Sequence, residues 1–297
     1  MLSVLVPIYN YSVVHLVTTL HKQLTACNIP FEILCLDDGS DKEYVLKNKV
    51  IESLIHTSFF KSEENKGRTE TRQRLSYASK FDWLLFLDSD TLPKNNTFIA
   101  NYISHLNTDI DAIFGGITYK DTPPKPEFLL RWKYGIKYES QTAETRKPLP
   151  FKNIVSANMC MRKHVFNAIN TNITYNAYGL DNYFGSKLKE NKAKILHINN
   201  PVYHLGLESN NVYLLKKEEA TQTLLKLIRE NLIKNKDNKI LCLFQLLKKT
   251  HLNHLFSYIY KTSHPAIKKQ LTSENPSISL FQFYRIAYMC YVDKKTK

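Results

Sequence analysis

The chain has 297 residues, of which 43% are hydrophobic and 23% charged. This composition excludes a disordered or fibrous protein and leaves room for one large domain with an appendage. Its net charge of +14 favours an anionic partner, such as nucleic acid, lipid headgroups or a phosphorylated substrate. No apolar run reaches the roughly 18 residues of a transmembrane helix, and no basic leader predicts a secretory signal. The five scattered cysteines favour reduced thiols and a cytoplasmic protein.

The first half of the chain alternates between strand-like and helix-like segments. Hydrophobic spacing predicts helices at 13–24, 42–52 and 67–79. The intervening apolar segments predict strands at 2–6, 31–36, 58–61 and 83–87. Because these strands are apolar on both faces and alternate with helices, we expect an α/β fold with a mostly parallel sheet flanked by helices.

The second half is less regular. Strands are expected at 112–118, 154–161 and 194–198, a stiff loop at 121–126, helices at 127–141 and 179–190, and a mobile loop at 142–152. After His204 the sequence predicts Lys-rich amphipathic helices at 214–233, 240–249 and 252–261, then an aromatic segment at 280–291. We therefore expect a catalytic domain at 1–206 and a basic helical region at 207–297, where 16 Lys and Arg face 7 Asp and Glu.

Two acidic clusters follow strands of the expected sheet, Asp37-Asp38 after one strand and Asp88/Asp90 after another. Ligands of such sheets bind outside the carboxyl ends of the strands. Neighbouring carboxylates raise one another's pKa unless a cation or strong donors neutralise them. A divalent metal that also binds a diphosphate fits this arrangement. Asp109 and Asp111 have the same spacing but precede a strand, so we expect them in a solvated turn.

The ordered motifs LSVLVPIYN, ILCLDDGSD, Asn65-Lys66-Gly67, FLDSDTLP, YGLDNYFG and PVYH resemble the family 2 glycosyltransferases of the GT-A fold. The resemblance spans about residues 2–206. It implies an inverting transfer of one sugar from a nucleotide sugar. It also implies donor contacts at the positions of this sequence that match the family's motifs.

The resemblance implies that Pro7 and Tyr9, in the loop after the first strand, lie at the nucleotide base. Asp38 would accept a hydrogen bond from a base N–H. The alternative for Asp38 is a turn-forming residue before Gly39. Arg72 would lie near the base or the diphosphate. The residues on either side of Arg72 depart from the family's motif, so Arg68 or Lys66 would share this role; the alternative is that all three are only surface charges.

The same resemblance implies that Asp88 binds the ribose hydroxyls, with Ser89 also among the donor-binding residues. Asp90 would bind Mn²⁺ or Mg²⁺ under the diphosphate, and His204 would be a second metal or phosphate ligand. The metal would stabilise the charge that develops on the departing nucleoside diphosphate. Asn158 is a further candidate for contact with the sugar.

Asp181 is the candidate catalytic base, because an inverting transfer needs a carboxylate to take the proton of the acceptor hydroxyl. It matches the Asp of the family's Glu-Asp pair, but Leu180 replaces the Glu. This departure leaves the details of acceptor binding open. The alternative interpretation of Asp181 is an ordinary acidic residue at a helix N-terminus.

We therefore expect a metal-dependent glycosyltransferase, with a UDP-sugar as the favoured donor. The acceptor would be a glycan or a lipid-linked saccharide of cell-surface polysaccharide or lipopolysaccharide synthesis. A catalytically impaired relative that only binds nucleotide sugars or glycans is the alternative. No recognisable module predicts nucleic-acid binding.

Two roles remain open for the basic C-terminal helices. They would dock on the anionic cytoplasmic face of the inner membrane, where each basic residue near the surface contributes about 1 kcal/mol. Otherwise their apolar faces would close the acceptor side or pair two subunits.

Overall fold

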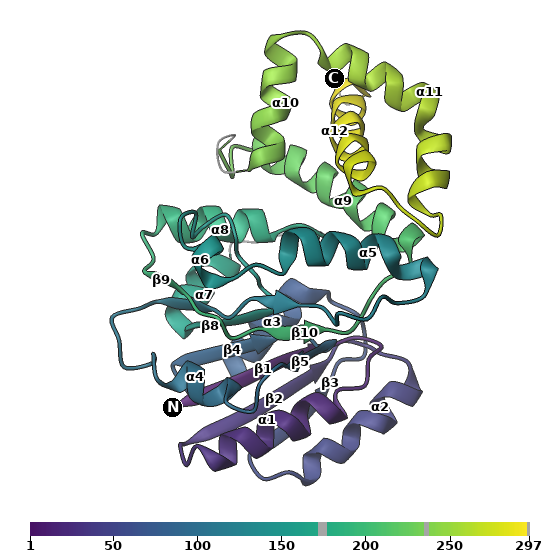
Figure 1. Ribbon diagram of the computed structural model, residues 1–297. Coiled ribbons are helices and arrows are strands. Elements are labelled where there is room, and N and C mark those ends of the chain that lie inside the picture. Colours follow the sequence, from purple (N-terminus) through teal and green to yellow (C-terminus); the bar gives the residue numbers. More distant parts are fainter. Residues whose placement is uncertain (172–176, 235–237, 296–297) are drawn as a thin grey trace. The chain divides into compact units, whose positions relative to one another are not determined.

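The computed structural model of the chain describes residues 1–171, 177–234 and 238–295 (Figure 1). These residues form two compact units. The first unit contains 1–119, 188–206 and the described part of 140–176, and the second contains 120–139, 177–187 and the described part of 207–297. Each unit is thus assembled from separated stretches of the chain, and the division into domains 1–206 and 207–297 stays a prediction.

The first unit is built on a seven-stranded sheet with the strand order β3-β2-β1-β4-β8-β6-β9. All neighbouring strands are parallel except β8, which is antiparallel to β4 and β6. The sheet confirms the predicted mostly parallel α/β class. Its strands are β1 (Leu2–Ile8), β2 (Phe31–Asp37), β3 (Thr57–Lys61), β4 (Trp83–Leu87), β6 (Ala112–Phe114), β8 (Asn158–Arg162) and β9 (Ile195–His197).

Strand register aligns the two acidic clusters with one edge of this sheet. β1 pairs with β2 as far as Ile8 and Asp37, and it pairs on its other side with β4. Both partners run parallel to β1, so their carboxyl ends lie at the same edge. Every residue of β4 is buried, which explains why this strand has no polar face.

A second, three-stranded sheet has the order β5-β10-β7. Its strands are β5 (Thr91–Pro93), β7 (Ile117–Thr118) and β10 (Val202–His204). β10 is antiparallel to β5, with His204 opposite Thr91. This pairing brings His204 to the residue that follows Asp90.

The helices of the first unit are α1 (Val14–Ala26), α2 (Lys42–Asn48), α3 (Arg68–Ala78), α4 (Phe98–Ile103), α6 (Ala143–Arg146) and α7 (Lys163–Asn170). A 3₁₀ turn, Lys49–Ser53, extends α2. Helix α8 (Asp181–Glu190) begins among the residues of the second unit.

Among the segments of the first unit that differ from their prediction are 112–118 and 142–152. The expected strand 112–118 is split between the two sheets at Gly115 and Gly116, and Gly116 has a positive φ of 87°. The expected mobile loop at 142–152 contains α6, whose Arg146 is almost fully buried. The Arg146 guanidinium donates to the carbonyl oxygens of Phe114 and Ile198, so it fastens this segment to the sheet.

The second unit is helical. It contains α5 (Leu129–Tyr134), α9 (Asn210–Arg229), α10 (Lys239–Lys249), α11 (Asn253–Leu271) and α12 (Ile278–Lys295). A 3₁₀ turn, Pro126–Phe128, precedes α5, and a π-helical turn, Gly135–Glu139, follows it. The observed helix α11 is longer than the predicted helix 252–261, since it continues through Pro265 to Leu271.

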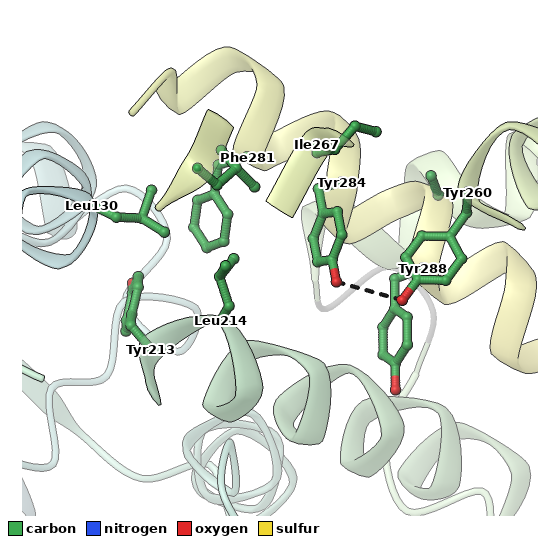
Figure 2. Packing of buried hydrophobic residues seen from close by; sticks show 10 residues of the cluster. Leu130, Tyr213, Leu214, Tyr260, Ile267, Phe281, Tyr284 and Tyr288 are labelled. Carbon is green, nitrogen blue, oxygen red and sulfur yellow. Dashed lines mark hydrogen bonds between the residues drawn. The ribbon is translucent and has the colours of Figure 1, made fainter. Parts of the chain in front are cut away.

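An aromatic core holds the second unit together, and helices α11 and α12 pack along each other within it. Figure 2 shows the buried side chains, in which the hydroxyl groups of Tyr260 and Tyr284 lie 3.4 Å apart. Its fully or largely buried members are Leu130, Tyr213, Leu214, Tyr260, Ile267, Leu271, Phe281, Tyr284, Ala287 and Tyr288. The aromatic segment at 280–291 thus forms core rather than surface.

Candidate functional site

The Asp38 carboxylate holds the loop between β3 and α3. It accepts hydrogen bonds from the backbone N–H groups of Lys66 (3.0 Å) and Gly67 (2.7 Å). Gly39 has φ +80°, and a Cβ there would lie 2.8 Å from the backbone nitrogen of Asn65. A glycine is therefore required at this close approach. The predicted contact of Asp38 with a base stays a prediction.

The loops after β1 and β2 are joined by side chains. Asp37 Oδ1 accepts from the backbone N–H of Ser40 (2.8 Å), and the Ser40 hydroxyl accepts from that of Asn10 (2.8 Å). Asn10 Oδ1 in turn accepts from the backbone N–H of Asp41 (2.8 Å). Asp37, not Asp38, is therefore the turn-forming residue, and Tyr9 is exposed at the edge of this joined pair of loops.

Pro7 lies inside β1 and not in the loop after it, which corrects its predicted position. The pairing of β1 with β4 ends at Leu5. Pro7 has no backbone N–H, so it is tolerated beyond the doubly paired part of the strand. Its predicted role at the base is untested by this position.

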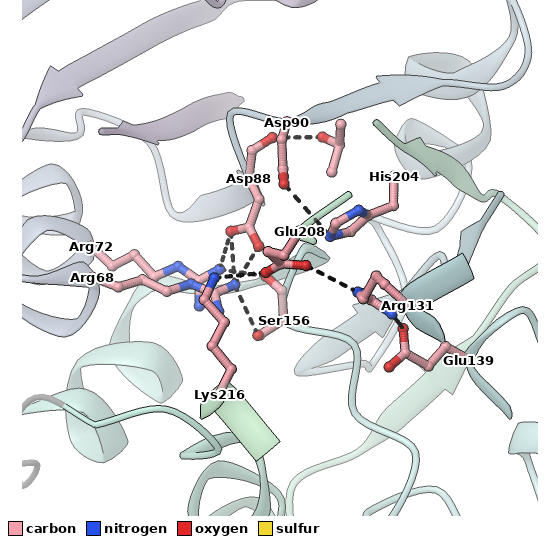
Figure 3. Close-up of polar contacts among 11 residues, drawn as sticks. Arg68, Arg72, Asp88, Asp90, Arg131, Glu139, Ser156, His204, Glu208 and Lys216 are labelled. Atoms are coloured by element: carbon pink, nitrogen blue, oxygen red, sulfur yellow. Dashed lines mark hydrogen bonds and ion pairs between the residues drawn. The ribbon is translucent and has the colours of Figure 1, made fainter. Parts of the chain in front are cut away.

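Two arginines of α3 bind the carboxylate of Asp88 (Figure 3). An Nη2 atom of Arg68 lies 2.5 Å from Asp88 Oδ2, and one of Arg72 lies 2.8 Å from Oδ1. Arg72 Nη2 also donates to the carbonyl oxygen of Ser156 (2.6 Å). Arg68 Nη2 also donates to the Ser156 hydroxyl (3.2 Å). Arg68, which from the sequence could share the role of Arg72, thus binds the same carboxylate as Arg72.

The charge of Asp88 is stabilised by these arginines. Burial raises the pKa of the Asp88 carboxyl, but the charges of Arg68 and Arg72 outweigh burial and leave the pKa below its ordinary value. Asp88 is therefore ionised at neutral pH. A carboxylate has about four lone-pair sites, so two arginines leave room for a hydroxyl donor.

Asp90 and His204 meet at the edge of the small sheet (Figure 3). Asp90 Oδ2 lies 3.6 Å from His204 Nε2. The backbone of Asp90 accepts from the N–H of Leu205 (2.8 Å), and the His204 ring stacks on Tyr119. A Cβ on Gly206 would lie 2.2 Å from Asp90 Oδ2, so only glycine leaves the carboxylate in this position. Ser89 lies in the turn between Asp88 and Asp90.

These atoms suit a divalent cation. A separation of 3.6 Å is compatible with two bonds of about 2.0–2.2 Å to one ion. His204 Nδ1 is buried and has no hydrogen-bond partner among the described residues. The described ranges contain no group of three or more His, Cys, Asp or Glu side chains for a metal. Asp90 and His204 would therefore need phosphate oxygens or water to complete the coordination, as Mg²⁺ usually does.

Asn158 is fully buried at the start of β8. Its Oδ1 accepts from the Tyr102 hydroxyl (2.7 Å), and its Nδ2 donates to the carbonyls of Gly116 (2.8 Å) and Asn200 (2.9 Å). These bonds join β8 to the turn that splits 112–118. Asn158 therefore supports the scaffold, and its predicted contact with the sugar stays a prediction.

Asp181 belongs to the second unit, where it is exposed at the first position of α8. The turn before it is fastened to α9. Tyr178 donates its backbone N–H to Glu219 (2.9 Å). Gly179 has φ +95°, and a Cβ there would lie 3.1 Å from the Cβ of Ala220. This close approach fixes the start of α8 beside the middle of α9.

A charged network lies in the same unit (Figure 3). Arg131 Nη1 lies 2.7 Å from Glu139, and Arg131 Nε lies 3.3 Å from Glu208. Glu208 also binds Lys216 at 2.6 Å. No sequence pattern predicts this network, because its four members lie on separate segments. The sequence also does not predict that Gly206 positions Asp90. The signal that it offers is a glycine two residues after His204.

Within residues 1–171, 177–234 and 238–295, no helix has both the length and the apolar character needed to cross a bilayer.

Comparisons with known proteins identify relatives of this chain. Residues 3–169 match the sequence profile of Glycosyl transferase family 2. An uncharacterized glycosyltransferase of Haemophilus influenzae is 31% identical over 140 residues, which cover 43% of this chain and 45% of that protein. The match thus spans less than half the length of this relative.

Solved structures share the fold. The mannosyltransferase PcManGT from Pyrobaculum calidifontis, in complex with GDP-Man and Mn²⁺, has a TM-score of 0.58 and 11% identity, over 99% of this chain and 86% of that one. TarS 1-349 from S. aureus, in complex with UDP-GlcNAc, has a TM-score of 0.52 and 15% identity, over 99% and 91%. At such identities the likeness concerns the fold alone.

Proposed function

The chain belongs to glycosyl transferase family 2, and from this premise we propose that it transfers one sugar, with inversion, from a nucleotide-diphosphate sugar to a hydroxyl group of a saccharide. The observation that carries the proposal is the arrangement at the carboxyl ends of β2 and β4. There Asp38, the arginine-bound Asp88 and the Asp90–His204 pair all lie in the first unit.

The donor would bind at this edge of the sheet. Asp38 would accept from a base N–H and Asp88 from the ribose, with Tyr9 against the base. Arg68 is 43% exposed at its side chain, whereas Arg72 is 8% exposed. Arg68 is thus the arginine that can leave Asp88 and pair with the diphosphate, while Arg72 keeps Asp88 charged. A UDP-sugar is the favoured donor, because the family uses UDP most often.

Asp90 and His204 would hold Mn²⁺ or Mg²⁺ under the diphosphate. When bound, the metal supplies Lewis-acid stabilisation of the charge on the departing nucleoside diphosphate. Gly206 contributes by leaving the Asp90 carboxylate the room to face His204.

Asp181 would be the base. The acceptor hydroxyl oxygen forms the new bond to the anomeric carbon, the bond from that carbon to the diphosphate breaks, and Asp181 takes the hydroxyl proton. The exposure of Asp181 at the start of α8 supports this role, because an acceptor must reach the carboxylate.

The test is turnover of UDP- and GDP-sugars by the full chain with Mn²⁺, with and without EDTA. We expect turnover that EDTA abolishes. Asp181→Asn should lose transfer while it still binds the nucleotide, and Asp121→Asn, an exposed aspartate of the same unit, should keep transfer. Nucleotide binding without turnover of any donor would instead favour the impaired, binding-only relative.

The acceptor would be a glycan or lipid-linked saccharide of the cell surface.

Exposed apolar side chains support docking of α10 and α11 on an anionic membrane, among them Leu246, Leu255 and Tyr258. Lys249 and Lys261 are exposed on the same helices. We expect the protein to float with vesicles that contain anionic lipid at low salt and to dissociate at high salt. Absence of binding at low salt would refute membrane docking.

A further inference from the structure

A lysine of α9 lies among three tyrosine rings of the second unit. Lys217 Nζ is 5.0 Å from the ring centroid of Tyr213, 5.2 Å from that of Tyr134 and 5.6 Å from that of Tyr178. The guanidinium of Arg285, on α12, lies 5.7 Å from the Tyr134 ring and donates to the Tyr134 hydroxyl (3.2 Å). We call these five residues the Lys217 cluster.

The carboxylates nearest to the cluster are already paired with other cations. Glu139 binds Arg131, and Glu208 binds both Arg131 and Lys216. Neither Lys217 nor Arg285 has a carboxylate within 4 Å in the described part of the chain. Two like charges thus lie at one tyrosine ring, and among the described residues neither forms an ion pair with a carboxylate, so an anion would relieve their repulsion.

Hydrogen-bond donors of the cluster also lack acceptors. The Tyr213 hydroxyl is fully buried, and Arg285 Nε is buried as well. Neither atom has a hydrogen-bond partner among residues that the structure describes. Glu208 Oε2 is also without a hydrogen-bond partner among the described residues, but it lies 3.3 Å from Arg131 Nε in an ion pair. Buried donors without a partner are rare, and they point to a ligand with acceptor oxygens.

The ionisation of Lys217 agrees with such a ligand. Burial is the main cause that lowers the pKa of the ammonium group to about 8. The charges of Arg285 and Arg131 act in the same direction, and those of Glu139 and Glu208 oppose them. The group is therefore still mostly charged at neutral pH. An anion beside it would raise this pKa.

The cluster lies on the same side of α9 as the predicted base. The Tyr178 ring contacts Lys217, and Tyr178 precedes Asp181 by three residues. The packing of Gly179 on Ala220 keeps this turn against α9. A group bound by the cluster is thus held beside the start of α8.

We propose that the Lys217 cluster binds a phosphate group carried by the acceptor, so that the acceptor is a phosphorylated saccharide. Phosphate fits because its oxygens accept on several sides, and the donors come from two separate helices, α9 and α12. This inference rests on the proposed function, since it names the substrate that Asp181 would activate.

Inorganic phosphate is the first probe, added to the full chain. We expect binding by calorimetry, which Lys217→Met weakens by about tenfold to a hundredfold, the range for a lost charged hydrogen bond. Lys294→Met removes the same charge from an exposed lysine of α12 and should leave phosphate binding unchanged. Equal affinity in both variants would overturn the proposal.

A second measurement does not depend on a variant that folds. In the unmutated protein, the NMR titration of the Lys217 side chain should move to higher pH when phosphate is added. A titration that phosphate does not move would overturn the proposal. Lys217→Arg, which keeps the charge, should retain part of the phosphate affinity.

Two further arms separate the sources of phosphate. UDP with Mn²⁺ should bind equally to the unmutated protein and to Lys217→Met; a parallel loss of UDP affinity would assign the cluster to the donor and overturn the acceptor proposal. Vesicles with anionic lipid should likewise bind equally to the unmutated protein and to Lys217→Met. Weaker binding of vesicles to the variant would assign the cluster to a lipid headgroup and overturn the acceptor proposal. If Lys217→Met still hydrolyses the donor but phosphate does not bind, the proposed function stands and the cluster proposal fails. If phosphate binds but no donor is turned over, the proposed function fails and phosphate binding by the cluster stands.

Discussion

Asp88 and Asp90 have the same spacing as Asp109 and Asp111, but the two pairs have different surroundings. Asp88 is bound by two arginines, and Asp90 lies 3.6 Å from His204. Asp109 is 88% exposed and pairs with Lys194, whose backbone N–H donates to Asp111 (2.8 Å). One aspartate pair therefore faces several cationic or metal-binding groups, and the other faces one surface lysine.

The difference follows from the position of each pair relative to its strand. Asp88 and Asp90 follow β4, at the edge where the loops of a parallel sheet gather side chains from distant segments. Asp109 and Asp111 precede β6, which runs in the same direction as β4, so this pair lies at the opposite edge of the sheet. This placement agrees with the solvated turn predicted for that pair.

The largest expected effect is the loss of turnover in Asp90→Ala. Removal of a group that stabilises developing charge typically costs about 10²- to 10³-fold in rate. Donor turnover with Mn²⁺ measures it. Asp109→Ala is the matched control and should keep the activity of the unmutated protein. Similar losses in both variants would contradict the assignment of the metal to Asp90.

The sequence was sufficient to predict the strands of the parallel sheet and the edge at which the acidic residues lie. The short apolar run of β4, followed directly by polar residues, favours a strand buried on both faces, because such a strand has no polar face. Helices α4 (6 residues) and α7 (8 residues) were not predicted, since such short segments contain too few turns for a helical period.

The site could be predicted only in part. Asp88 and Asp90 follow a recognisable strand, whereas the pairing of β10 with β5 that brings His204 to this edge depends on contacts between distant segments. From the sequence, Arg68 and Lys66 could both be named as residues that share the role of Arg72. Which arginine reaches Asp88 depends on the direction of α3, which periodicity does not fix.

The second expected effect concerns Gly206→Ala. A Cβ would lie 2.2 Å from Asp90 Oδ2, so the carboxylate must turn away from His204. A displacement of about 1 Å can cost on the order of 10²-fold in rate, and we expect a loss of this size in metal-dependent turnover. The midpoint for Mn²⁺ activation should rise as well. Unchanged activation by Mn²⁺ would show that the Asp90 carboxylate does not act from this position.

The third expected effect is on stability. Arg72→Met removes a donor to Asp88 and to the carbonyl of Ser156, so we expect the free energy of unfolding in urea to fall by about 1–3 kcal/mol. Lys194→Met removes the partner of Asp109 at the surface and should leave the urea midpoint unchanged. An equal loss in both variants would show that the Asp88 pair is no more stabilising than the surface pair.

The smallest expected effect is a pH dependence that belongs to Asp88. Because Arg68 and Arg72 lower the pKa of Asp88 despite its burial, the folded state binds the Asp88 proton less readily than the unfolded state does. The resulting stabilisation is fully present above the ordinary value of 3.8 and is lost as the pH falls through the lowered pKa of the folded state. The difference in unfolding free energy between the unmutated protein and Asp88→Asn should therefore shrink below about pH 4.

The same comparison in an Arg68→Met/Arg72→Met background should lose this pH dependence, because the two charges that lower the pKa are then absent. A difference that stays constant from neutral pH to pH 3 would mean that the arginines do not hold Asp88 in its charged form.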